Sequence, residues 1–186
     1  MVPLSSLILP IVVSAVIVFV VSSIIHMVLP YHRTDFQKLP KEDEVQDALR
    51  RFSIPAADYI LPCPEGPAGM SKPDFVAKRN KGPVVFMTVL PGGPVSMTQS
   101  LVLWFIYSLV VGLFAGYIAS RALSPGVHYL EVFRFVGASA FMGYALALLQ
   151  NSIWFHRNWG FTLKSMFDGL VYALLTAGTF GWLWPR

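Results

Sequence analysis

Long apolar runs separated by shorter polar stretches make up most of this chain. Four runs are long enough to cross about 30 Å of hydrocarbon as helices, which takes roughly 20 residues each. They cover residues 4 to 28, 98 to 120, 130 to 153 and 162 to 184. The pattern predicts an all-α integral membrane protein with four transmembrane helices. The first run is expected to be an N-terminal anchor within residues 1 to 29, and the last three a bundle within 98 to 186.

Residues 30 to 97, between the first two runs, have a different character. They hold ten of the fourteen prolines. Prolines at this density interrupt helices and strands too often for an independent domain of ordinary size. Charge and apolar spacing predict short helices over 41 to 52 and 72 to 81, the second with Ser71 as its N-cap. The stretch VVFMTVLPGGPVSM then predicts a short hairpin around its Pro-Gly-Gly-Pro turn, or a strand pair. We expect this segment to cap the bundle.

Composition agrees with a membrane protein and narrows the function classes. Hydrophobic residues make up 55% of the 186 residues, charged residues only 13%, and the mean hydropathy is +0.59. These values exclude a large soluble enzyme and a disordered chain. The net charge of +4 does not indicate nucleic acid binding, because nine basic residues between 30 and 97 are interleaved there with eight acidic ones.

The basic residues instead predict the orientation in the membrane, because Lys and Arg are held on the cytoplasmic side. Eleven lie in the 30 to 97 segment and in the turn between the last two runs, against three on the opposite side. We therefore expect a Pro-rich cytoplasmic segment between the first and second helices, and both termini outside, which in a bacterium is the periplasm.

Small residues recur at every fourth position in three of the predicted spans, a spacing that lets helix backbones approach closely. Gly and Ala are also common in spanning helices generally, but three such runs favour packing faces. The first span has no such run and is expected at the periphery, or packed through bulkier Ile and Val. The packing positions are Ser108, Gly112, Gly116 and Ser120; Ser139, Gly143 and Ala147; and Gly169, Ala173, Ala177 and Gly181.

Asp168 is the charged residue placed deepest in a predicted span, nearly two turns from its start. A carboxylate there needs a partner or a proton. Lys164 is expected to pair with it along the helix, and Asn151 or His156 across the helix gap. The result is either an interhelical hydrogen-bond network or a functional polar site, and its candidate members are His26, Gln150, Asn151, His156, Lys164 and Asp168.

The sequence contains no enzyme signature and predicts no catalytic residue. The four histidines lack the spacing of a metal site, because His128 and Glu131 form only a single H-x-x-E pair. His26 and His156 end different spans on the same side, which leaves open a haem- or quinone-binding redox subunit as a weaker alternative. The lone cysteine, Cys63, has no partner for a disulfide. No metal and no cofactor are predicted.

Three stretches, HMVLPYHRTDFQKLPKEDEVQDALR, KGPVVFMTVLPGGPVSM and DGLVYALLTAGTFGWLWP, resemble a family of uncharacterised bacterial inner-membrane proteins of about this length. The resemblance covers essentially the whole chain. It implies a multi-pass protein of the bacterial inner membrane and carries over no activity and no site residue.

The pattern as a whole favours a small membrane scaffold or accessory subunit that acts through helix packing. Its expected partners are the lipid bilayer and either a second copy or another membrane protein. The alternative is a small oligomeric transporter or channel that uses the polar cluster around Asp168.

Overall fold

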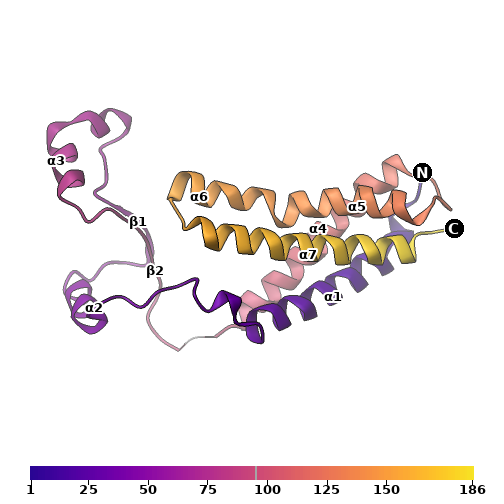
Figure 1. The fold of residues 1–186 in the computed structure, drawn as a ribbon, viewed down its shortest axis with the longest axis horizontal. Helices are drawn as coiled ribbons and strands as arrows, with labels where there is room; N and C mark the ends of the chain where they lie inside the picture. Colours follow the sequence, from indigo (N-terminus) through magenta and orange to yellow (C-terminus); the bar gives the residue numbers. More distant parts are fainter. Residues whose placement is uncertain (95) are drawn as a thin grey trace. The chain divides into compact units, whose positions relative to one another are not determined.

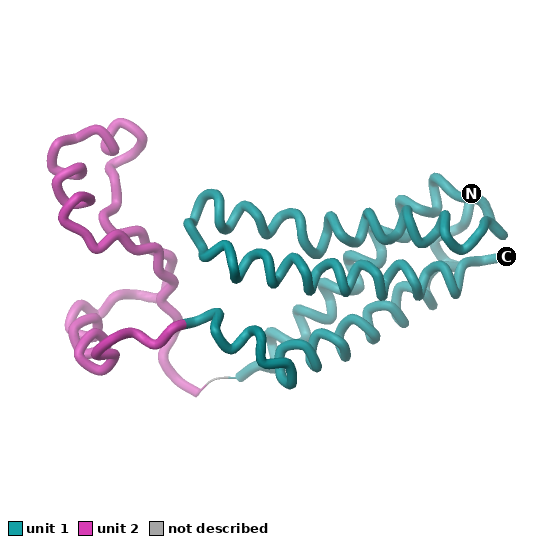
Figure 2. Tube along the Cα trace, in the orientation of Figure 1, with its two compact units in different colours: residues 1–36, 96–186 teal, residues 37–95 magenta. Residues whose placement is uncertain are grey.

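The structure, a computed structural model, describes residues 1–94 and 96–186 and is mostly helical. It divides into two compact units, one of residues 1–36 and 96–186 and the other of residues 37–95 (Figure 2). The first unit is a bundle of long helices with the shorter α6 (Leu149–Phe155), and the second holds two short helices and the two strands.

The bundle contains four helical segments long and apolar enough to span a membrane, as the sequence predicts. They are α1 (Ile8–Met27), which continues the 3-10 turn Leu4–Leu7; α4 (Thr98–Ala122); α5 (Tyr129–Tyr144) with α6 (Leu149–Phe155); and α7 (Trp159–Leu183). The chain ends meet at one end of the bundle (Figure 1), where the amide of Val2 donates to the Ser120 carbonyl and that of Gly126 to the Pro185 carbonyl.

The third segment is not the single helix that was predicted. It breaks after Tyr144, passes through a 3-10 turn at Leu146–Leu148 and resumes as α6. The break contains no proline and follows Gly143, so the residue pattern does not mark it. At this point α7 comes very close, because a side chain at Gly169 would begin only 3.1 Å from the Tyr144 carbonyl oxygen.

Small residues provide the close approaches between helices, as predicted. A Cβ atom on Gly116 of α4 would lie 2.9 Å from the Phe180 ring of α7, and one on Gly143 of α5 would lie 3.1 Å from Val111 of α4. Gly112 of α4 faces α1, and Gly169 and Gly181 of α7 face α5. Ala173 and Ala177, between them on α7, are buried.

The first helix is not peripheral, contrary to one expectation from its sequence. It packs against both α4 and α7. Its buried face includes the bulky Ile11, Val18 and Ile25, but also the small Ser14 and Ala15. At Gly112 of α4, α1 presents both the small Ser14 and the bulky Ile11, which agrees with the alternative expectation that α1 packs through Ile and Val.

The second unit contains α2 (Glu42–Arg50), β1 (Ala57–Leu61), a 3-10 turn at Pro67–Ser71, α3 (Pro73–Lys81) and β2 (Val85–Val89). The two helices confirm the short helices predicted, but Lys72 rather than Ser71 is the N-cap of α3, and its side chain makes no capping bond. β1 and β2 are antiparallel, with Ala57 opposite Val89 and Leu61 opposite Val85. The local hairpin predicted around Pro-Gly-Gly-Pro is wrong where the structure describes it, because β2 pairs with a strand before α3. Val95, within that stretch, lies outside the described residues. The two-stranded sheet also corrects the all-α prediction.

This second unit has almost no interior. Among its described residues only Pro62 and Gly69 are buried, and every residue of the hydrophobic core that the structure describes lies in the bundle. Backbone hydrogen bonds and local ion pairs, rather than a core, therefore organise residues 37–94.

Candidate functional site

The chain turns sharply where α1 ends, and this turn builds a polar cluster. After Met27 the chain passes into a 3-10 turn at Pro30–His32, where proline fits the first position because it has no amide hydrogen to leave unpaired. The turn brings residues 31 to 35 against α7, whose Lys164 and Asp168 face it.

Asp168 is buried, with 2% of its surface exposed, and both of its oxygens are hydrogen-bonded. The hydroxyl of Tyr31 donates to Oδ1, and Nε2 of His32 lies 2.8 Å from Oδ2. The prediction that Lys164 pairs with Asp168 is wrong. Instead, Tyr31 and His32, from the turn after α1, hydrogen-bond to the Asp168 carboxylate. Lys164 pairs with Asp35.

His32 lies between two carboxylates. While Nε2 faces Asp168, Nδ1 lies 2.6 Å from Oδ2 of Asp35. Both ring nitrogens of His32 are therefore within hydrogen-bond distance of a carboxylate oxygen. The two carboxylate side chains are only 4% and 3% exposed, so these are charge-assisted bonds in a largely dry environment.

Lys164 completes the cluster from the other side. Its Nζ donates to Oδ1 of Asp35 at 2.8 Å, to the Tyr31 carbonyl at 2.6 Å and to the Thr34 hydroxyl at 3.1 Å. Burial would raise the pKa of Asp35, but the hydrogen bonds from Lys164 and His32 outweigh it and hold that pKa below its ordinary value. The Lys164 ammonium thus pairs with the buried Asp35 carboxylate, and pairing is the condition under which buried charges are tolerated.

Tyr31 and His26 flank His32. Burial, together with the hydrogen bond to Asp168 and its charge, raises the pKa of the Tyr31 phenol, which therefore keeps its proton and remains a donor. The rings of Tyr31 and His26 lie 4.2 Å and 4.5 Å from the His32 ring, centroid to centroid. His26, His32 and Asp168 each have one nitrogen or oxygen atom that could bind a metal ion, and these three atoms lie within 4.8 Å of one another.

The structure thus assembles three of the six predicted polar residues, His26, Lys164 and Asp168, into one cluster. The other three belong to α6: Gln150 and Asn151 lie in its first turn, and His156 is its C-cap, in a left-handed conformation with φ of 51°. The ligand-type group around His26 contains His32 and not His156, so the geometry does not favour the haem pairing considered from the sequence.

Sequence reasoning missed Tyr31, His32 and Asp35. Each of Tyr31 and His32 lies just beyond an apolar run. From the sequence, Tyr31 is therefore interpreted as an aromatic residue at the membrane interface, and His32 as a histidine at the membrane boundary. The available signal is the pair His32 and Asp35 at a spacing of three, directly after Pro30. Nothing local indicates that this pair meets residues 164 and 168.

Polar groups continue from the cluster into the bundle. Tyr172 lies one helical turn beyond Asp168 on α7, and its ring packs against those of Trp104 and Tyr144 at 5.7 Å each. The hydroxyls of Tyr144 and Tyr172 are buried without a hydrogen-bond partner within the described ranges. Trp104, in turn, donates from Nε1 to the Ser22 hydroxyl at 2.8 Å.

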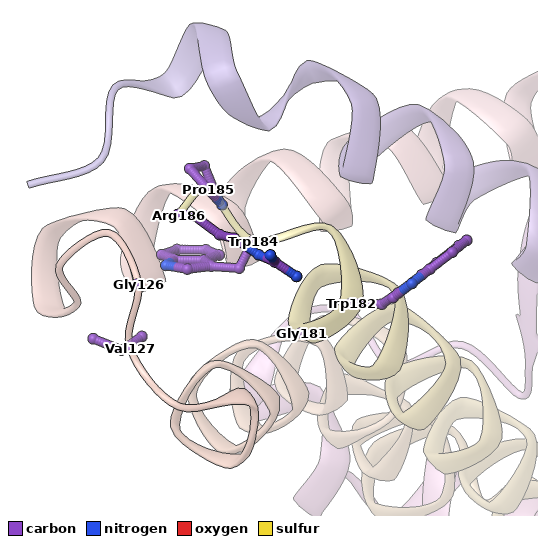
Figure 3. Close-up of a pocket in the computed structure, with 7 residues that line it drawn as sticks. All are labelled: Gly126, Val127, Gly181, Trp182, Trp184, Pro185 and Arg186. Atoms are coloured by element: carbon purple, nitrogen blue, oxygen red, sulfur yellow. The ribbon is translucent and has the colours of Figure 1, made fainter.

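A second feature lies at the other end of α7, about 20 Å from Asp168 at 1.5 Å per residue. It is an open pocket of about 310 Å³ beside the turn between α4 and α5 (Figure 3). Its lining is mostly aromatic rings and glycine backbone, with Arg186 as the charged member: Gly126, Val127, Gly181, Trp182, Trp184, Pro185 and Arg186. Such a set of tryptophans at helix ends is typical of a membrane boundary.

Comparison of the chain with protein-family models, with curated proteins and with solved structures gives no match.

Proposed function

We propose that this protein is a multi-pass membrane accessory subunit, in which the four-helix bundle anchors residues 37–95 for binding to a partner protein. The four apolar helices support insertion in a bilayer. Large apolar side chains also point outward along them, among them Val20, Phe114 and Leu174, as expected of surfaces that contact lipid.

The observation that carries the proposal is the missing interior of the second unit. Its described residues fold into two helices and a sheet, yet large apolar side chains remain more than half exposed. Exposed apolar surface that gathers in one region is a mark of interaction sites. The residues are Leu39, Phe52, Leu61, Met70 and Leu90.

Charge favours a protein over a lipid surface as the occupant. Residues 37–94 hold eight basic and seven acidic residues, whereas binding to anionic lipids uses clusters of four to eight basic residues. Leu90 directly follows β2 at the end of the sheet where Ala57 pairs with Val89, and Phe52 lies in the segment that leads from α2 to Ala57. An apolar patch with mixed charges around it is the usual composition of a protein interface.

The proposed orientation follows the basic residues. Residues 37–95 face the cytoplasm of a bacterial cell, and both termini face the periplasm, because the basic residues gather on the side of this segment. The partner is accordingly a cytoplasmic protein or the cytoplasmic face of another membrane protein.

Affinity capture from membranes solubilised in mild detergent tests the proposal. The full chain is compared with a Phe52→Ser, Leu90→Ser double variant and with Phe114→Ser on the outer face of α4. We expect one protein at near-equal amounts with the full chain and the Phe114 variant, and its loss with the double variant. Equal recovery with all three, or recovery of the chain alone, would contradict the proposal.

A second candidate function, a small transporter or channel, is supported by the buried cluster around Asp168 and by the buried phenols that follow it on α7 and α5. Protons or ions would then exchange at Asp168. Flux measured in proteoliposomes separates the two candidates. Asp168→Asn should abolish a real flux, while His128→Asn, outside the cluster, should leave it unchanged.

A further inference from the structure

Two imidazoles and one carboxylate converge where α1 ends beside α7. The ligand-type atoms of His26, His32 and Asp168 lie within 4.8 Å of one another, and all three residues belong to the bundle unit. We propose that they bind one divalent transition-metal ion of the zinc class. The site goes beyond the partner-binding function and does not depend on it.

The donor set suits such an ion. Imidazole nitrogens and a carboxylate oxygen are ordinary zinc ligands, and three protein ligands leave one position open for water. With bonds of about 2.0 to 2.1 Å, the ligand atoms of a tetrahedral site are about 3.3 Å apart. The 2.8 Å between His32 Nε2 and Asp168 Oδ2 must therefore widen slightly. His26 is exposed on the last turn of α1, so its ring has room to close on the ion.

The surrounding hydrogen bonds orient the ligands toward a common point. Asp35 lies at Nδ1 of His32 at 2.6 Å, which directs Nε2 toward Asp168. A carboxylate at the second nitrogen is the usual support of a metal-bound histidine. Asp35 is itself fixed by Lys164 at 2.8 Å, and Tyr31 donates to Oδ1 of Asp168, leaving Oδ2 for the ion.

Electrostatics also agree with a cation at this position. A metal ion would take the place of the proton that His32 and Asp168 share, since a ligating imidazole must present a lone pair. Asp168 would then ligate the ion directly, and Asp35 would lie across the His32 ring from it, with Lys164 on the far side of Asp35. The ion would tie together α1, the turn after it and α7.

Cobalt binding by the full chain in mild detergent tests the site, because Co²⁺ bound by nitrogen and oxygen ligands absorbs visible light. The protein is purified through a histidine-free tag and stripped with a chelator. We expect saturation at one Co²⁺ per chain, with the intense bands of a tetrahedral or five-coordinate ion, and their loss when Zn²⁺ is added.

Two variants locate the binding. His26→Phe keeps a ring against His32 but removes the ligand nitrogen, and should weaken Co²⁺ binding at least about tenfold, the loss that even a supporting residue produces. His128→Asn is the matched control: His128 caps α5 through its Nδ1, Asn also caps helices well, and binding should be unchanged.

Equal affinity of the full chain and His26→Phe would overturn the proposal, as would failure to saturate a single site. If His26→Phe does not fold, the spectrum of the unmodified chain decides. Intense bands support the site, and the pale spectrum of a hydrated octahedral ion overturns it.

Discussion

The close approach of α7 to the break in the third span makes Gly169 a position where one methyl group should be costly. A Cβ atom there would lie 2.9 Å from Cβ of Ala145 and 3.1 Å from the Tyr144 carbonyl oxygen. Carbon atoms in contact prefer about 3.5 to 4.0 Å, and the obstacle is largely backbone. Gly169→Ala therefore forces the helices apart, which costs about 1 to 3 kcal/mol where overpacking has been measured.

An opposing term has to be removed before this cost can be measured. Alanine is favoured over glycine in a helix interior by about 0.5 to 1 kcal/mol. Gly178→Ala on the same helix carries that gain without the clash, because its nearest atom is the Tyr129 hydroxyl at 3.6 Å, an ordinary contact. The difference in stability between the two variants is then the steric cost alone, about 1 to 3 kcal/mol.

Reversible unfolding of the purified chain in mixed micelles, followed by helical circular dichroism, gives both free energies of unfolding. Gly169→Ala should unfold more easily than Gly178→Ala by that amount. Equal stability of the two, or a more stable Gly169→Ala, would refute the packing of α7 against the break.

Three further predictions concern the cluster and the orientation. Asp168→Leu should destabilise by about 3 to 5 kcal/mol, as removal of one partner from a buried pair does, whereas Asp168→Asn, which still accepts from Tyr31, should cost clearly less. The pKa of Asp35 is lowered in the folded state, so its ionised form stabilises the fold above the ordinary carboxyl pKa of about 3.9. This contribution is lost as the pH falls through the lowered pKa. Asp35→Asn should therefore flatten that part of an acid-unfolding curve. A cysteine at Lys41, with Cys63 replaced by Ser, should not react with an impermeant thiol reagent on intact cells.

Each of these predictions has a direct control. Asp74 is exposed on α3, so Asp74→Leu should change stability by less than about 0.5 kcal/mol; if it matches Asp168→Leu, burial is not the cause. If Asp35→Asn and the unmodified chain lose stability equally as the pH falls, Asp35 does not contribute to acid unfolding. A cysteine at Ser124, at the opposite end of the bundle, should react in the labelling assay, and the reverse pattern would invert the orientation.

The long helices were predictable because their apolar runs are local. The length needed to cross a bilayer is visible in consecutive apolar residues. The four-residue spacing of Gly112 and Gly116, or of Gly169 and Ala173, already marks the packing faces. The interruption after Tyr144 was not predictable in this way, because no residue type at the break requires it.

The cluster was only partly predictable because it is non-local. Asp168 has to be satisfied wherever it lies, so a polar network around it follows from its depth alone. Its actual partners, however, are 136 and 137 residues away in sequence, and they reach it through the turn at Pro30. The strand pairing failed for the same reason, since β2 pairs across α3 with β1 rather than with the residues that follow its own turn.

Photo-crosslinking in living cells tests most directly the claim that residues 37–95 bind a partner protein. A photoreactive phenylalanine analogue is placed at Leu90 or Phe52, both 74% exposed, and for comparison at Phe114 on the outer face of α4, 63% exposed. The proposal predicts a discrete adduct with one other protein from positions 52 and 90, and no protein adduct from position 114. Adducts only between two copies of this chain, or no protein adduct at either position, would contradict it.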